Sequence, residues 1–194
     1  MNTNITSAVN AIKHPESMGH CLPDICQDIS VKPNQHSALI PSDPREAGSD
    51  FHRLLLRMAD SGPLVDRERA YLPWLTPARK FIWNLGVTEL EIEKKLHGFA
   101  GLPNGVCDLL AHGGPQALGP IEVKVIRNGS LDSPRHKDLA QLGAYARLAA
   151  SHRSFDRMWA ALLYVEIENK RICMRGFSSA RGLIETSVAL IRAA

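Results

Sequence analysis

The sequence lacks several features that would place the protein in a membrane or outside the cell. No apolar run reaches about 18 residues, the length that a membrane-spanning helix needs. The first twenty residues lack the basic start and apolar core of a secretory signal peptide, so we expect a cytoplasmic protein with no membrane contact. Aromatic residues are only 6% of the 194 residues, too few for a broad base-stacking surface. These absences leave a globular protein of one domain as the expectation.

Cysteine is also scarce, and its spacing argues against the common zinc folds. Cys21 and Cys26 form one close pair, whereas Cys107 and Cys173 stand alone. A zinc ribbon needs two close pairs. An iron–sulfur cluster would require the two lone cysteines to converge on the pair in the folded protein. We expect free thiols, as is usual inside cells.

The chain divides by composition near residue 47. Residues 1–47 contain five prolines and no sustained periodicity, so regular elements there must be short, and we expect a partly ordered arm. This arm has three Lys and Arg against five Asp and Glu, whereas residues 48–194 have twenty against fifteen. The excess positive charge of the body favours an anionic partner.

Hydrophobic periodicity in residues 48–194 predicts an α/β domain with a central mixed sheet flanked by helices. Ser49 or Asp50 is expected to cap its first helix. We predict helices over 48–60, 66–84 (interrupted near Pro73 and Pro77), 137–151 and 178–193, and strands over 88–96, 106–111, 121–126, 158–167 and 171–176.

Three charged residues on two predicted strands point to a metal. Glu122 and Lys124 are two apart on an otherwise apolar strand, so both side chains leave the same face. Asp108 is central to the preceding strand, and two strands of a sheet could bring the carboxylates together. Close carboxylates repel unless a cation lies between them, and Mg²⁺ typically takes one or two carboxylates with waters and phosphate.

Other polar residues have an ordinary explanation when each is taken alone. Gln141 and Tyr145 share one face of a predicted helix, as in any amphipathic helix. His52 lies on an earlier helix, and Glu91 on the strand beside that of Asp108 is the acid we expect to support the metal ligands. Basic groups near the start of the Gln141 helix could contact phosphates. They are Arg127, Arg135, His136 and Lys137.

Taken in order along the chain, these residues resemble the PD-(D/E)XK nuclease superfamily. Asp108, the Glu122-x-Lys124 pair and the Gln141-xxx-Tyr145 helix match its motifs, and Gly48-xxx-His52 resembles the RecB-like branch. The likeness spans about Gly48 to Leu148, with two departures. Cys107 stands where the motif has proline, and the four-cysteine cluster of some RecB-like members is missing.

The resemblance implies a restriction-endonuclease-like core and a role for each matching residue. Asp108, Glu122, the Val123 carbonyl and His52 would hold Mg²⁺ or Mn²⁺. Lys124 would activate water and stabilise charge on the phosphate, with Gln141 and Tyr145 positioning it.

The expected activity is hydrolysis of DNA phosphodiester bonds by a RecB-like exonuclease acting on linear ends of single- or double-stranded DNA. One alternative is a structure-selective or sequence-specific endonuclease of the same superfamily. Another is a module that binds nucleic acid or a protein partner and catalyses no reaction. A homo-oligomer, or a helicase or recombination partner, would suit a small exonuclease.

Overall fold

The computed structural model describes residues 4–57, 64–126, 133–151 and 157–194. Its strands form one sheet in the spatial order β1-β6-β5-β4-β3-β2, and only β4 and β5 are parallel to each other. The strands are β1 (Ile25–Ser30), β2 (Val87–Leu96), β3 (Gly105–Gly113), β4 (Leu118–Ile126), β5 (Ala160–Glu166) and β6 (Arg171–Phe177).

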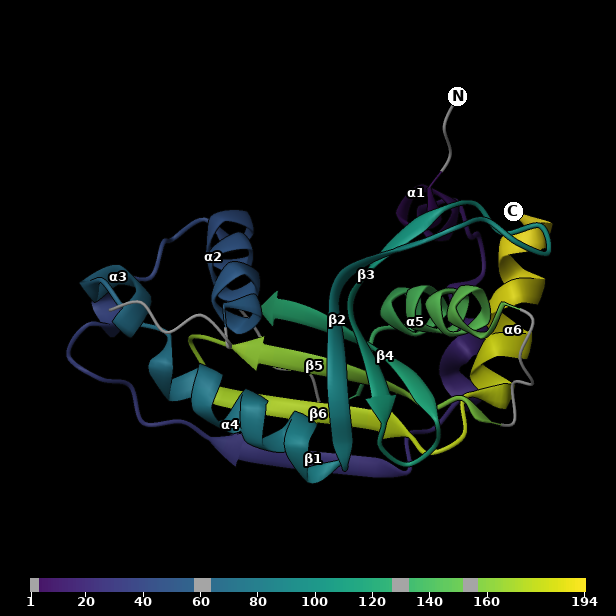
Figure 1. Cartoon of the computed structure of the whole chain (residues 1–194). Helices are drawn as coiled ribbons and strands as arrows, with labels where there is room; N and C mark the ends of the chain where they lie inside the picture. Colours follow the sequence, from purple (N-terminus) through teal and green to yellow (C-terminus); the bar gives the residue numbers. More distant parts are fainter. Residues whose placement is uncertain (1–3, 58–63, 127–132, 152–156) are drawn as a thin grey trace.

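Helices cover both faces of this sheet, and a separate apolar cluster lies under each set (Figure 1). On one face α5 (His136–Ala150) and α6 (Arg181–Ala193) pack with α1 (Ile5–Asn10) and the short 3-10 helix η1 (Pro15–His20). The other face carries α2 (Pro44–Leu56) and α4 (Leu72–Asn84). This architecture confirms the predicted α/β class with a central mixed sheet flanked by helices. No helix within the described ranges is long and apolar enough to cross a membrane.

Residues 4–47 take part in the same fold as the body. Their elements are short, as the prolines predicted, but β1 forms six register pairs with β6 as an edge strand of the sheet. Ile5 and Val9 of α1 are buried in the cluster beneath α5. The missed strand alternates half-buried and exposed residues, a pattern that depends on its partner β6.

The helices before the sheet differ in detail from their prediction. α2 starts at Pro44, because the Asp43 side chain accepts a hydrogen bond from the backbone N–H of Arg45. The expected cap at Ser49 or Asp50 is therefore wrong. The interval 66–84 divides into α3 (Asp66–Arg69) and α4, with Pro73 in the first turn of α4, where a missing N–H costs nothing.

The sheet opens between the antiparallel strands β3 and β4. The ladder of β3 and β4 ends at the Leu109–Ile121 pair, whereas β4 continues beside β5 as far as Ile126. Backbone groups on the β3 side of β4 must therefore find side-chain partners beyond Ile121. This opening is where the predicted site residues meet.

Candidate active site

A chain of hydrogen bonds joins β4 to α5. The Lys124 ammonium donates to Oε1 of Glu122 at 2.7 Å and to Oε1 of Gln141 at 2.9 Å. Gln141 in turn donates from Nε2 to the Tyr145 hydroxyl at 2.9 Å. The structure thus brings together the two pairs that the sequence placed on a strand and on a helix face.

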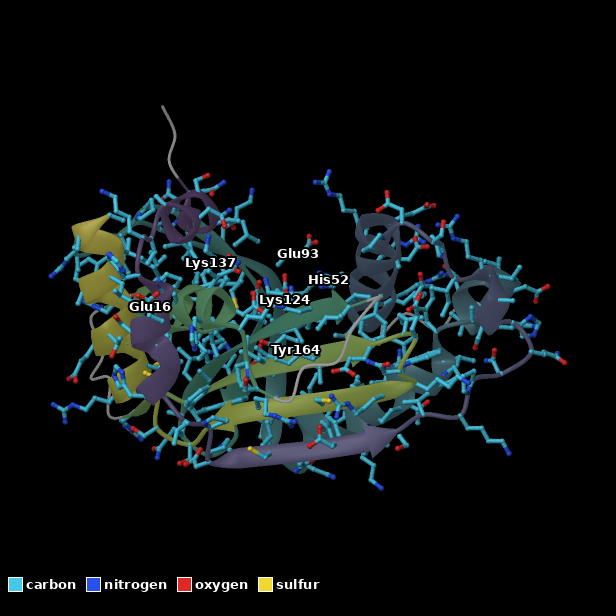
Figure 2. The ribbon with its side chains drawn as sticks, turned by 180° about the vertical axis from the view of Figure 1, so that it is seen from behind. Glu16, His52, Glu93, Lys124, Lys137 and Tyr164 are labelled. Carbon is cyan, nitrogen blue, oxygen red and sulfur yellow. The ribbon has the colours of Figure 1, made fainter. Side chains whose placement is uncertain are left out.

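Asp108 and His52 occupy the opening beside β4. Oδ2 of Asp108 accepts a hydrogen bond from the Val123 N–H at 2.8 Å, in place of the missing strand ladder. Nε2 of His52, reaching in from α2, lies 3.0 Å from the carbonyl oxygen of the same Val123. Nδ1 of His52 is 3.6 Å from Oδ1 of Asp108. Asp108 and His52 thus engage both backbone groups of Val123, and Figure 2 shows His52 in the same region of the molecule as Lys124.

Glu122 is the most confined member of this group. It is 3% exposed, and its Oε2 has no hydrogen-bond partner among the described residues. Burial, and next the negative charge of Asp108, raise its pKa to about 8, against the opposing charge of Lys124. Burial, the largest single influence, would lower the pKa of Lys124, but the charge and hydrogen bond of Glu122 together with the charges of Asp138 and Asp108 outweigh it and raise the pKa. The site therefore holds more negative charge than its own cation balances.

Two residues that the sequence did not single out lie beneath Lys124. Tyr164 on β5 is in register with Lys124, and its hydroxyl donates to Oδ2 of Asp138 at 3.0 Å. Burial and the Asp138 charge raise the pKa of Tyr164. The Asp138 charge also acts on Glu122 and Lys124. Asp138 precedes Gln141 by three residues, a helical spacing that could have indicated it.

The carboxylates of Asp108 and Glu122 fit a magnesium or manganese ion that has only a few protein ligands. No group of three or more His, Cys, Asp or Glu side chains in the described part of the chain is arranged to hold an ion. One oxygen of Asp108 and one of Glu122 already have protein partners, which leaves Oδ1 and the unpartnered Oε2. Mg²⁺ is usually held by one or two carboxylates, with waters and substrate oxygens completing its shell. The unpartnered buried oxygen is the observation that supports this fit.

The structure does not bring Glu91 to this group. Its Oε1 is 2.9 Å from Nε2 of His112, and Oε2 pairs with Lys94. The register shows why: Glu91 lies opposite Leu110, two positions from Asp108. Glu93 is the acid at the level of Asp108, and its positive φ of 45° interrupts the alternation of β2. The register with β3 is unbroken on both sides of Glu93, so the departure is confined to its own backbone conformation.

The predicted phosphate-contacting residues gather at the start of α5, with one outside the described residues. Arg127 is that one. Arg135 is exposed, and its backbone N–H donates to the Tyr164 hydroxyl at 3.3 Å. Lys137 is exposed and His136 half-buried. These cations border the group that contains Lys124 and Tyr164.

The cysteines lie apart from the group, with one exception. All four are unbridged, and Cys26 is exposed whereas Cys107 and Cys173 are buried. Cys107 precedes Asp108, and burial raises the pKa of its thiol well above the usual value. Its Sγ donates to the Leu109 carbonyl, so it acts as a small apolar residue of the strand.

Comparisons with known proteins give structural neighbours of low similarity. No family model and no curated protein matches the chain. Among solved structures it is similar to SSO0001, with 17% identity and a TM-score of 0.34 over 72% of this chain and 70% of that one. It is also similar to LHK-Exo, an alkaline exonuclease from Laribacter hongkongensis, with 13% identity and a TM-score of 0.36 over 82% and 84%. At these scores the structural similarity supports no conclusion about function. The argument for a function therefore rests on the residues of the site.

Proposed function

We propose that the protein is a divalent-metal-dependent nuclease that hydrolyses DNA phosphodiester bonds, as a RecB-like exonuclease. The observation that carries this proposal is the buried Oε2 of Glu122, which has no hydrogen-bond partner in the described part of the chain although Asp108 and Lys124 lie beside it. A buried carboxylate oxygen without a hydrogen-bond partner lowers the stability of the folded protein. We therefore expect such an oxygen where a bound ligand supplies the missing partner.

In this proposal Asp108 and Glu122 hold Mg²⁺ or Mn²⁺, with the Val123 carbonyl and His52 as further donors. When bound, the ion neutralises charge on the phosphate and makes hydroxide available near neutral pH. His52 now engages the Val123 carbonyl, so it would have to turn to become a ligand itself. An imidazole donor favours Mn²⁺ over Mg²⁺.

Lys124 is the residue that acts on the substrate. Its ammonium has three donors, of which Glu122 and Gln141 take two, so the third can bind the attacking water or a phosphate oxygen. The raised pKa keeps the ammonium charged, as a stabiliser of phosphate charge must be. Gln141, itself held by Tyr145, positions the ammonium.

The proposed substrate is DNA because the surroundings of the site are cationic. Residues 48–194 carry the excess of positive charge, and Arg135 and Lys137 lie exposed at the start of α5. Such groups bind phosphates without reading sequence. An oligomer or a helicase partner would keep a small exonuclease on its substrate, and that is part of the same proposal.

The test is degradation of linear single- and double-stranded DNA by the purified protein in Mg²⁺ or Mn²⁺. We expect Lys124→Ala to lower the rate by about 10²–10³-fold. The control Lys80→Ala removes an exposed lysine on α4, outside the group, and should cut like the wild type.

Other outcomes select between the alternatives. Opening of closed circular DNA would indicate an endonuclease, because such DNA has no ends. DNA binding without cleavage in either metal would contradict the enzyme and favour a binding module. Equal rates for Lys124→Ala and wild type would show that the chemistry lies elsewhere.

A further inference from the structure

A surface cavity adjoins the group on the far side of Tyr145. Its volume is about 320 Å³, at the lower end of the range for small-molecule sites. The end of β2, the start of β3 and the start of α1 form its walls together with α5. Its polar lining comprises Asn4, Thr6, Lys95, His97, Asn104 and Tyr145.

The cavity is connected to Lys124 by two hydrogen bonds. Tyr145 lines the cavity, and its hydroxyl accepts from Gln141, which accepts from Lys124. The Tyr145 ring lies directly against the backbone of Gly105, where any Cβ would come within 2.7 Å of it. A side chain at Gly105 would displace the ring, so the glycine helps to shape this wall.

The lining combines three kinds of chemistry. Val106, exposed to 48%, offers apolar surface, whereas Ile5 and the Tyr145 ring are buried in the wall behind it. Asn4 and Asn104 are exposed, and because each Oδ1 accepts a backbone N–H, of Ser7 and of Gly98, their NH₂ groups are left to donate. The exposed Lys95, in register with Val106, and His97 supply basic groups at the rim. Bases are bound by stacking and by amides, and phosphates by cations.

We infer that this cavity is a subsite for one nucleotide unit of the substrate strand, next to the cleaved phosphodiester. The inference rests on the proposed function and adds where the strand is held. The base lies against Val106, with Tyr145 in the wall behind it and its polar edge toward the asparagines, and its phosphate lies toward Lys95 and His97. Because Tyr145 also holds Gln141, a bound nucleotide steadies the residue that positions Lys124.

The experiment measures binding of dAMP to the full chain by NMR titration in EDTA, so that no metal contributes. Val106→Trp adds a ring to the cavity wall, and Lys95→Ala removes the rim cation. We expect each to weaken dAMP binding by about tenfold or more. Ile92→Trp is the control for the first, since Ile92 is exposed to 45% and Val106 to 48% on the same hairpin, and only Val106 lines the cavity. Lys80→Ala is the control for the second.

Deoxyadenosine and inorganic phosphate separate the two halves of the ligand. Each should bind more weakly than dAMP, with Val106→Trp affecting deoxyadenosine and Lys95→Ala affecting phosphate. An unchanged dAMP affinity in both variants, or no dAMP binding by the wild type, would overturn the subsite. Because EDTA excludes cleavage, the readout is independent of the proposed function. If the protein binds dAMP in this pattern but cuts no DNA, the subsite is supported and the proposed nuclease activity is contradicted. If it cuts DNA but does not bind dAMP in this pattern, only the subsite is contradicted.

Discussion

Two glutamates on neighbouring parallel strands are equally buried and differently paired. Glu166 at the end of β5 is 0% exposed, and Arg171 reaches both of its oxygens, at 2.9 and 3.1 Å. Asn169 donates to it as well, at 3.2 Å. Glu122 on β4 is 3% exposed, yet only Oε1 is paired, and Asp108 adds a like charge nearby.

We propose that the difference separates a structural carboxylate from a functional one. A buried charge that serves stability is surrounded by donors, because each oxygen left unpaired costs free energy. Glu122 retains that cost on a strand whose β3 side is open. Its environment is therefore prepared for a positive ligand rather than for the free protein alone.

The largest expected effect concerns DNA cleavage. Glu122→Gln should lower the cleavage rate by at least about a hundredfold, because it removes the charge that faces the metal and Lys124. Glu166→Gln should retain the wild-type rate per folded molecule, since its partners lie outside the group. Degradation of linear DNA in Mn²⁺ measures both, and similar losses in the two variants would remove the distinction.

Metal binding should sharpen the same contrast. A ligand at a hundred times its dissociation constant stabilises a protein by about 2.7 kcal/mol. We therefore expect Mn²⁺ to raise the melting temperature of the wild type and of Glu166→Gln, but not of Glu122→Gln. Thermal unfolding in EDTA and in Mn²⁺ checks this, and a full shift in Glu122→Gln would place the ion elsewhere.

Stability without metal should reverse the ranking of the two glutamates. Glu166→Gln should lower the free energy of unfolding by about 2 kcal/mol, because Arg171 loses its charged partner. Near neutral pH Glu122→Gln should leave it unchanged or raise it, since the variant removes a buried charge and relieves the repulsion with Asp108. Urea denaturation in EDTA measures both values. A larger loss for Glu122→Gln would show that this carboxylate also serves stability.

The pH dependence of stability should also distinguish Glu122. The pKa of Glu122 is about 8 in the folded protein against 4.5 as its ordinary value. Between these values the folded state binds more protons, so the free energy of unfolding falls as pH rises, by at most about 1.4 kcal/mol per pH unit. The free energy of unfolding of the wild type minus that of Glu122→Gln, measured in EDTA, should show this fall. A difference that does not change with pH would show that Glu122 has an ordinary pKa.

Local patterns predicted most of the body. The strand over 121–126 and the helix over 137–151 match β4 and α5 within three residues, because period-two and period-four apolar patterns are properties of contiguous sequence. β1 was missed because the prolines near it predicted a segment without regular secondary structure, and only its pairing with β6 makes it a strand. Glu91 was chosen over Glu93 although alternation puts both on one face, and only the register with β3 shows that Glu93 lies at the level of Asp108.

The sequence by itself determined which chemical groups enter the site and in what order. Two-residue spacing puts Glu122 and Lys124 on one face of a strand, and four-residue spacing puts Gln141 and Tyr145 on one face of a helix. Only the tertiary structure decided that β3 and β4 part at Asp108 and that α5 buries Glu122 without satisfying it. Those features depend on contacts between segments far apart in the chain, and burial, charge balance and pKa follow from such contacts rather than from local spacing.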